Sequence, residues 1–368
     1  MPPPEPAVAL DPSISFAQTG LPGAAGLPAP ASPGSETGGL GEPPPDSGAA
    51  TPVSSLPPAP AGPFRFFSPT GFWNKVVAAS APLAASSAAA ASEFDAEIAR
   101  AEAEGKGPSV NTAAWSVPVY TVPADQPLVA VQLWSPARAP ALQSAWQAVP
   151  LPVGAEPAAG TDKHLVVWQP SSGKLWEFWK LEDGPEGWDA SWGGAIEDVS
   201  KASGAYGPEA WPGSTMGWGA SACSLSIAGG LITLEDLDRG EIDHALAMAI
   251  PAPRLGLYAL PAQRTDGWSS NPLALPEGAH LRLDPRLDLA ALKLPRFTLM
   301  LAQAAQRYGI FVRDTAANVV FYAQDPTPTG ANPYIGVGGY FEGKTAQQLM
   351  ASFPWSALQV LSSPLQSS

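Results

Sequence analysis

Residues 164–180 read His-Leu-Val-Val-Trp-Gln-Pro-Ser-Ser-Gly-Lys-Leu-Trp-Glu-Phe-Trp-Lys and form the densest aromatic cluster of the chain. Residues 165–169 and 174–181 are rich in β-branched, leucine and aromatic residues. Between them, residues 170–173 have the early proline and late glycine of a turn. A polar run at 182–187 predicts a second turn before Trp188 and Trp192. The pattern therefore predicts an antiparallel meander of two or three strands.

A four-residue loop built on a type I turn sets the register of the first two strands. In this register Val166 faces Glu177. Carrying the register across a six-residue second turn places Trp192 beside Glu177, with His164 diagonal to it at roughly 7–8 Å. Because side chains alternate along a strand, one face carries His164, Val166, Trp168, Leu175, Glu177, Trp179 and Leu181.

Glu177 is the first candidate catalytic residue, because it is a carboxylate in an apolar row. Apolar neighbours raise the pKa of a carboxyl group and suit it to general acid or base chemistry. The flat faces of Trp168, Trp179 and Trp192 would bind the C–H side of a sugar ring. In the alternative interpretation, Trp176 and Phe178 form the buried face and Glu177 points to solvent.

Two histidines are candidate partners of Glu177, namely His164 at the start of its strand and His244 after Asp243. His244 would act as a general base, or it would bind a sugar hydroxyl together with Asp243. The alternative is a hydrogen-bonded polar pair between a helix and a strand. Glycoside hydrolysis needs a second carboxylate, and the sequence does not choose among Glu197, Asp198, Glu241 and Asp243.

Composition separates residues 1–63 from the rest of the chain. This segment holds 17 of the 44 prolines and neither lysine nor arginine, which predicts a disordered, Pro-rich tail or spacer. The remaining residues carry 28 acidic against 19 basic side chains, a balance that argues against nucleic acid. No apolar run is long enough to predict membrane insertion, and residues 1–5 do not have the features of a signal peptide.

The three histidines and one cysteine are too scattered for a close-spaced metal motif, and no nucleotide motif is present. We therefore expect no metal and no cofactor. The sequence gives no expectation for the oligomeric state.

The rest of the chain predicts many short strands with a few helices. Helices are expected at 92–104, with Ser92 as the N-cap, and at 233–240, 298–308 and 345–350. Residues 310–313 and 318–322 predict a hairpin. Residues 244–250 predict a strand with three alanines on one face, and we expect that face to pack closely against a flat surface. We therefore expect a mainly β domain at 64–361, of jelly-roll or β-sandwich type with short α-helices, and a flexible C-terminus at 362–368.

Several motifs recur together in one order, and they carry a resemblance that covers residues 64–361. The motifs are Phe72-Trp-Asn74, residues 162–168 with 176–179, Gly240-Glu-Ile-Asp-His-Ala-Leu246, Pro276-Glu-Gly278 and Ala305-Gln-Arg-Tyr-Gly309. As a set they resemble a largely uncharacterised family of bacterial, mainly actinobacterial, β-rich secreted or cell-envelope proteins. The resemblance implies an extracellular or cell-envelope location and the handling of glycans.

Three functions fit these observations. The first is a carbohydrate-binding protein that uses the face of Trp168, Trp179 and Trp192. The second is a glycan-active enzyme, a lyase or glycoside hydrolase, with Glu177 and a histidine as acid and base. The third is a structural component of a surface layer or particle, in which the tryptophans only form the core.

Overall fold

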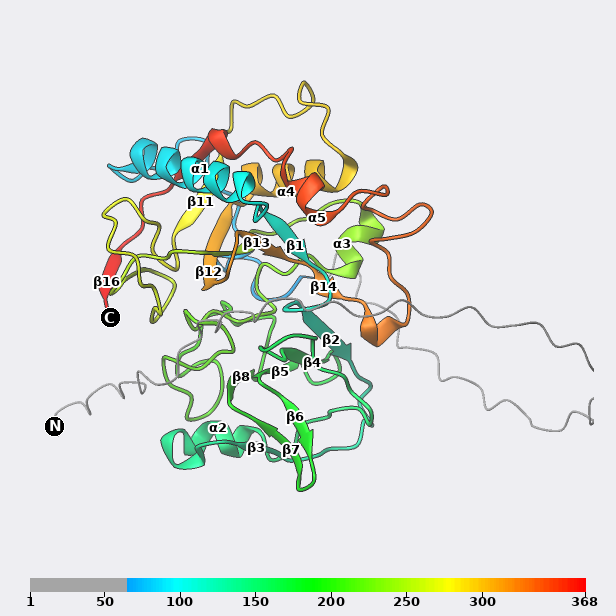
Figure 1. The fold of residues 1–368 in the computed structure, drawn as a ribbon. Coiled ribbons are helices and arrows are strands. Elements are labelled where there is room, and N and C mark those ends of the chain that lie inside the picture. Colours follow the sequence, from blue (N-terminus) through cyan, green and yellow to red (C-terminus); the bar gives the residue numbers. More distant parts are fainter. Residues whose placement is uncertain (1–64) are drawn as a thin grey trace, which may run out of the picture.

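The computed structural model describes residues 65–368, so the predicted tail at 1–63 lies outside the described residues. A six-stranded sheet crosses the molecule, with α1, α4 and α5 on one side and the smaller sheets on the other (Figure 1). The described residues form five α-helices: α1 (Ser87–Ala103), α2 (Pro140–Ala145), α3 (Leu234–Arg239), α4 (Arg296–Arg307) and α5 (Ala346–Met350). Three short 3-10 helices are η1 (Pro136–Arg138), η2 (Thr327–Thr329) and η3 (Trp355–Ala357).

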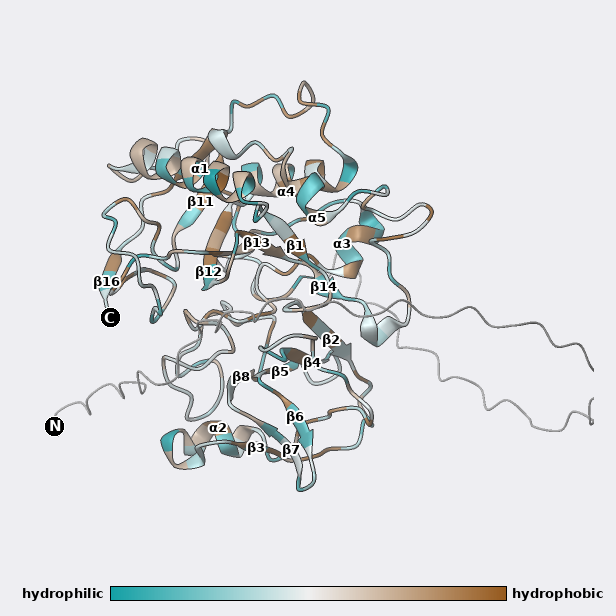
Figure 2. Ribbon diagram, in the orientation of Figure 1, coloured by the Kyte–Doolittle hydropathy of each residue, from teal (hydrophilic) through white to brown (hydrophobic). Residues whose placement is uncertain are grey.

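The six-stranded sheet has the order β1-β13-β9-β12-β11-β15 and is mixed, because β1 and β13 are parallel, as are β9 and β12. Its strands are β1 (Ser109–Asn111), β13 (Val320–Tyr322), β9 (Leu246–Ile250), β12 (Ile310–Thr315), β11 (His280–Leu283) and β15 (Leu358–Val360). Strand β12 is largely brown, hence hydrophobic, in Figure 2. The face towards the helices carries one hydrophobic cluster, which includes Leu246, Met248, Ile310, Phe297 and Leu301.

The predicted hairpin of residues 310–322 is wrong, because β9 lies between β12 and β13. Every residue of β9 is buried, as is usual for a strand in the middle of a covered sheet. The connection from β12 to β13 passes the end of β9. There the Ala316 N–H donates to the Ile250 carbonyl at 3.1 Å, an ordinary backbone hydrogen-bond distance. Pairing with a distant strand has replaced the local pairing.

The alanine face of β9 packs closely, as predicted. Ala245, Ala247 and Ala249 belong to the second hydrophobic cluster, on the side away from the helices. A Cβ on Gly230 would lie 2.4 Å from the Ala247 nitrogen and 2.6 Å from the Trp73 ring. Only a glycine backbone and alanine side chains allow this approach.

The five-stranded sheet confirms the predicted register of the first hairpin. It consists of β14 (Gln324–Asp325), β2 (Val117–Thr121), β4 (Leu165–Gln169), β5 (Lys174–Trp179) and β8 (Trp192–Ile196), in that order. Val166 lies opposite Glu177, and Trp168 lies opposite Leu175. The turn chemistry of residues 170–173 was therefore sufficient to set this register.

The predicted position of Trp192 is wrong, because it pairs with Trp179 while Glu177 pairs with Gly194. The polar run at 182–187 is a hairpin rather than a simple turn, made of β6 (Glu182–Gly184) and β7 (Gly187–Ala190). Strand β7 also pairs with β3 (Val131–Leu133), which gives a separate three-stranded sheet. This hairpin takes up the residues that the prediction assigned to a loop, and it shifts the register by two residues.

Helix boundaries follow local signals where a cap is strong. The Thr233 hydroxyl accepts from the Asp236 N–H at 3.1 Å and Gly240 ends α3 in the left-handed conformation, as predicted. The predicted start of α1 at Ser92 is wrong, because the helix begins at Ser87. Alanine is the best helix former, and buried Ala90 and Ala91 extend the apolar face of α1.

The C-terminal residues differ from the flexible end that was expected. Strand β16 (Leu365–Ser367) pairs antiparallel with β10 (Leu257–Ala259), since their backbone groups are complementary at this edge. The mainly β class with short helices is confirmed for residues 65–368. The jelly-roll or sandwich arrangement is not confirmed, because parallel pairs occur in both larger sheets.

Candidate functional site

Residues 218–233 form a continuous buried segment between the two larger sheets, and we call them the central segment. It bonds to both sheets: the Gly219 N–H donates to the Gly193 carbonyl of β8, and the Ala247 N–H of β9 donates to the Gly230 carbonyl. A loop without water must find protein partners for its backbone groups. The charged residues described next supply many of them.

Glu177 supports the central segment from the five-stranded sheet. Its carboxylate accepts from the Ala220 N–H at 2.8 Å, the Ile227 N–H at 3.0 Å and the Ser226 hydroxyl. Burial raises the pKa of Glu177, and the bonds from Ser226 and Ala220 partly offset this rise. The side chain is fully buried, so its contacts give it a structural role in holding two turns of the segment together.

Two arginines donate hydrogen bonds to backbone carbonyls of the central segment and of Gly217, which directly precedes it. Arg264 donates to the carbonyls of Ala222 and Ser221, both at 2.8 Å, and to those of Gly217 and Gly219. From β12, Arg313 donates to the carbonyls of Ile227 at 2.8 Å and Gly229 at 3.0 Å. The planar guanidinium group suits such multiple contacts.

Arg264→Met should lower the free energy of unfolding by about 2–3 kcal/mol, since buried carbonyls lose their donors while the packing volume is largely kept. Urea unfolding of the wild type and variant would measure this difference. Arg286→Met is the matched control, because Arg286 is exposed and, within residues 65–368, its side chain pairs only with Asp284. Equal destabilisation by both substitutions would contradict the proposed role of Arg264.

Three carboxyl groups lie together where the central segment meets the six-stranded sheet. Glu277 accepts from the Asp266 N–H at 3.0 Å, and Asp266 accepts from the Thr315 hydroxyl at 2.6 Å. Burial, followed by the charge of Asp266, raises the pKa of Glu277 well above its usual range and that of Asp314 to about 8. Glu277 and Asp314 therefore release their protons at a higher pH than exposed carboxyl groups do.

The structure brings His164 and Glu177 to one residue of the central segment. The His164 Nε2 atom lies 3.2 Å from the Ala220 carbonyl oxygen, and Glu177 binds the N–H of Ala220. Burial lowers the pKa of His164, with an opposing effect from Asp162. The shared contact makes the two side chains part of one packed layer.

The three predicted sugar-binding tryptophans also belong to this layer. Trp179 is only 3% exposed and donates to the Asp162 carboxylate at 3.4 Å. Trp192 is partly buried and donates to the Gly217 carbonyl at 3.0 Å, and Trp168 packs edge-on against Phe66. Their faces are therefore largely occupied by protein.

His244 and Asp243 lie apart from Glu177, beside α3. His244 Nε2 is 3.1 Å from the Asp236 carboxylate, and Nδ1 is 2.9 Å from the Ala245 carbonyl oxygen. Burial lowers the pKa of His244, but the charge of Asp236 and the hydrogen bonds to Asp236 and Ala245 together outweigh it, so the net pKa is raised. Asp243 forms a salt bridge with Arg65 at 3.3 Å. Both residues have protein partners between α3 and β9, as the alternative interpretation expected, but they pair with Asp236 and Arg65 rather than with each other.

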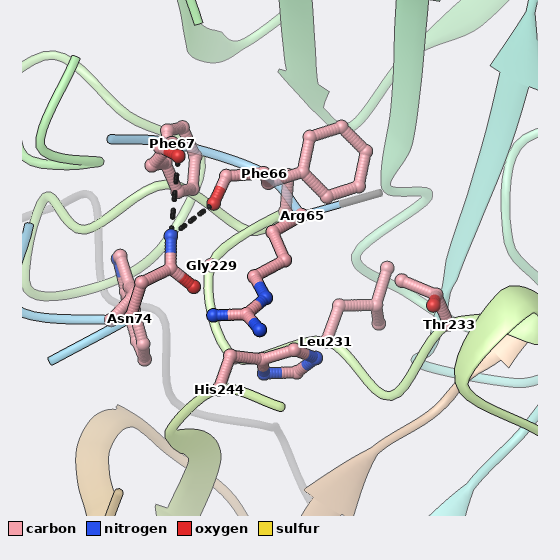
Figure 3. Close-up of a pocket in the computed structure, with 11 residues that line it drawn as sticks. Arg65, Phe66, Phe67, Asn74, Gly229, Leu231, Thr233 and His244 are labelled. Carbon is pink, nitrogen blue, oxygen red and sulfur yellow. Dashed lines mark hydrogen bonds between the residues drawn. The ribbon is translucent and has the colours of Figure 1, made fainter. Parts of the chain in front are cut away.

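The cavity beside His244 is too small for a sugar. Figure 3 shows Arg65, Asn74 and His244 directed towards one another around it. Its volume is about 10 Å³, the space of a single water molecule. Asn74 lines this cavity, and its buried Oδ1 atom, which has no hydrogen-bond partner among residues 65–368, is a suitable acceptor for such a water.

A larger groove of about 290 Å³ lies between α1 and the connection formed by residues 252–275. Helix α1 contributes Glu93, Glu97 and Arg100, which are four and three residues apart and so lie on one helical face. The opposite wall includes Ser269 and Asn271. Carboxylate, guanidinium, hydroxyl and amide groups thus face one hollow of the surface.

The opposite wall is held by its own hydrogen bonds. The Ser269 N–H donates to the Pro253 carbonyl at 2.9 Å, and the Asn271 side chain donates to the Glu93 carboxylate at 3.3 Å. Gly267 makes this turn possible, because a Cβ at that position would lie 2.4 Å from the Arg254 carbonyl oxygen. The groove is therefore built on tied backbone rather than on a loose loop.

Trp268 adjoins this groove and is 61% exposed. Its indole N–H donates to the carbonyl of Pro251 at 3.1 Å, next to Ala252 in the groove wall, and the following residue is Ser269. This contact fixes the indole next to two residues of the groove wall, Ala252 and Ser269, while Trp268 itself is not part of the lining and most of its surface stays in solvent. Exposed aromatic surface of this size is typical of a binding site.

We compared the chain with known proteins. Nothing matches: no family model, no curated protein and no solved structure is similar to it.

Two further observations limit the kinds of site. Within residues 65–368, no helix combines the length and apolar character needed to cross a bilayer. The same residues hold no group of three or more His, Cys, Asp or Glu side chains placed to bind a metal ion.

A second groove of about 410 Å³ lies on the other side of α1. Its lining includes small and polar residues such as Ala88 and Ser92, and no aromatic side chain is part of its described lining.

Sequence reasoning missed the α1 groove, although part of its signal is local. Trp268 stands in the polar run Asp266-Gly-Trp-Ser-Ser-Asn271, where no apolar neighbour would bury it. The spacing of Glu93, Glu97 and Arg100 also indicates one helical face. The contact between these two segments, more than 150 residues apart, has no local signal.

Proposed function

We propose that this protein binds carbohydrate in the groove between α1 and residues 252–275. The observation that carries the proposal is Trp268, an exposed indole bonded to Pro251 and followed by Ser269, which lines a hollow together with Glu93, Glu97, Arg100 and Asn271. An indole face can stack on the C–H side of a sugar ring, while charged and amide groups bind its hydroxyls.

The size of the groove supports a small part of a glycan as the ligand. Its volume of about 290 Å³ is at the lower end of ligand pockets, which measure about 300–1,000 Å³. One or two sugar units fit such a space, and the rest of a chain would extend into solvent. An extracellular or cell-envelope location, which the family resemblance implies, is part of this proposal because glycans are abundant there.

Trp268→Ala is expected to weaken glycan binding at least tenfold, about 1.4 kcal/mol, since it removes the stacking surface. A glycan array would first identify a ligand, and calorimetric titration would then compare the dissociation constants. Trp134→Ala is the matched control, because Trp134 is 75% exposed but follows β3, which contributes no residue to the groove lining. Weaker binding by the Trp134 variant alone, or no binding to any glycan, would overturn the proposal.

The other two functions stay predictions. A glycan-active enzyme with Glu177 and a histidine would need access to a carboxylate that is fully buried and bonded to Ala220 and Ile227. A structural surface component would use the tryptophans as core, a role that the burial of Trp179 supports. Neither accounts for the exposed Trp268 beside a polar groove.

A further inference from the structure

The charges in the α1 groove are not balanced. Glu93 and Glu97 supply two negative charges against the single positive charge of Arg100. Glu93 accepts from Arg100 at 3.2 Å and from the Asn271 amide at 3.3 Å. Arg100 is therefore already paired with Glu93, which lies about two helical turns before it.

Glu97 is the acid that this arrangement leaves over. Its carboxylate makes no hydrogen bond or salt bridge with the part of the chain from 65 to 368, although the side chain is partly buried in the groove wall. Burial raises the pKa of Glu97, Arg100 lowers it, and the neighbouring Glu93 raises it further. A positively charged ligand group would relieve both the desolvation and the repulsion.

We infer that the groove takes a glycan that carries a free primary amine, a deacetylated amino sugar, with its ammonium group against Glu97 and its ring on Trp268. This inference rests on the proposed carbohydrate binding and adds the class of sugar. A divalent cation fits less well, because it needs more oxygen ligands than Glu97 supplies and Glu93 is held by Arg100 and Asn271.

The test uses the full chain and four ligands in calorimetric titration at about pH 6.5, where most amines are protonated. The ligands are β-1,4-linked trisaccharides of glucosamine, N-acetylglucosamine and glucose, and trilysine. We expect the glucosamine trimer to bind at least tenfold more tightly than the other three ligands. Trilysine separates recognition of an amino sugar from attraction of charge alone.

Glu97→Gln should remove the preference for the glucosamine trimer, so that this trimer and the glucose trimer bind the variant with dissociation constants within about twofold of each other. Asp95→Asn is the matched control on the same helix, because it removes one negative charge but lines the second groove. It should keep the tenfold preference. Circular dichroism of both variants would show that α1 is intact.

Different results would overturn different statements. The inference fails if the N-acetylated trimer or trilysine binds as tightly as the glucosamine trimer, or if the preference survives in Glu97→Gln. In those cases carbohydrate binding itself still stands when Trp268→Ala weakens the binding of the trisaccharides. If none of the trisaccharides binds, or if Trp268→Ala changes nothing, the proposed function fails together with the inference.

Discussion

Glu177→Ala is expected to lower the free energy of unfolding by about 3–5 kcal/mol, a large part of the 5–15 kcal/mol that stabilises a typical domain. The substitution leaves the N–H groups of Ala220 and Ile227 and the hydroxyl of Ser226 buried without their acceptor. Each such group costs roughly 1–3 kcal/mol, and removing a buried acid returns only part of this cost. Urea unfolding followed by tryptophan fluorescence would measure the change.

Two further variants make this test specific. Glu177→Gln keeps one acceptor oxygen but turns an amide donor towards backbone N–H groups, so its effect should be intermediate. Glu182→Ala is the matched control, because Glu182 is about half exposed and its side chain pairs with Lys163 at the surface. Its effect should stay within about 0.5 kcal/mol. A Glu177→Ala variant within about 1 kcal/mol of the wild type would show that the central segment does not depend on this carboxylate.

Stability should fall as pH rises from about 4 to about 8, and Asp314→Asn should flatten this dependence. The pKa of Asp314 is raised to about 8 by burial and by the charges of Asp266 and Asp162. An unfolded chain releases this proton near pH 3.9, so the folded state binds more protons throughout the interval. The contribution is complete below about pH 4 and is lost by about pH 8, with an upper size of about 5 kcal/mol.

Denaturant titrations at about pH 4, 6 and 8 would measure this effect. The asparagine variant keeps an acceptor for the Thr315 N–H, which lies 3.0 Å from Asp314 Oδ1. Asp284→Asn is the control: the bond to Arg286 lowers the pKa of Asp284 to about 2, so its contribution changes only below about pH 4 and the substitution should leave the slope between pH 4 and 8 unchanged. Parallel curves for Asp314→Asn and the wild type would refute the role assigned to Asp314.

These two predictions concern one physical arrangement, a buried loop held between two sheets. Backbone groups of residues 218–233 are bonded by Glu177 from one side and by Arg313 from the other. Charged residues are rarely buried without such partners. The raised pKa values of Glu177 and Asp314 therefore accompany a structural device, and the proposed binding site lies elsewhere, at α1.

The exposed site and the buried layer also differ in what their substitutions should change. Trp268 and Glu97 lie at a hollow of the surface, so their substitution should alter binding with little effect on unfolding. Glu177 is fully buried and Arg264 is partly buried and bonded to four backbone carbonyls, so their substitution should alter unfolding first. Measuring both quantities for all four variants separates the two roles.

The sequence by itself determined those features whose hydrogen bonds close within a few residues. The turn at 170–173 placed Val166 opposite Glu177, and Thr233 with Gly240 bounded α3. The alternation of residues 244–250 identified an alanine face that packs closely. These signals are local, because turn geometry and helix capping depend on neighbouring residues.

Only the tertiary structure decided which distant segments meet. It placed β9 between β12 and β13, moved Trp192 opposite Trp179, and buried the central segment around Glu177. It also brought α1 and Trp268 to one groove, far from the aromatic stretch at 164–180. Strand order and burial depend on packing between segments far apart in the chain, and a local pattern records that a face is apolar without recording what covers it.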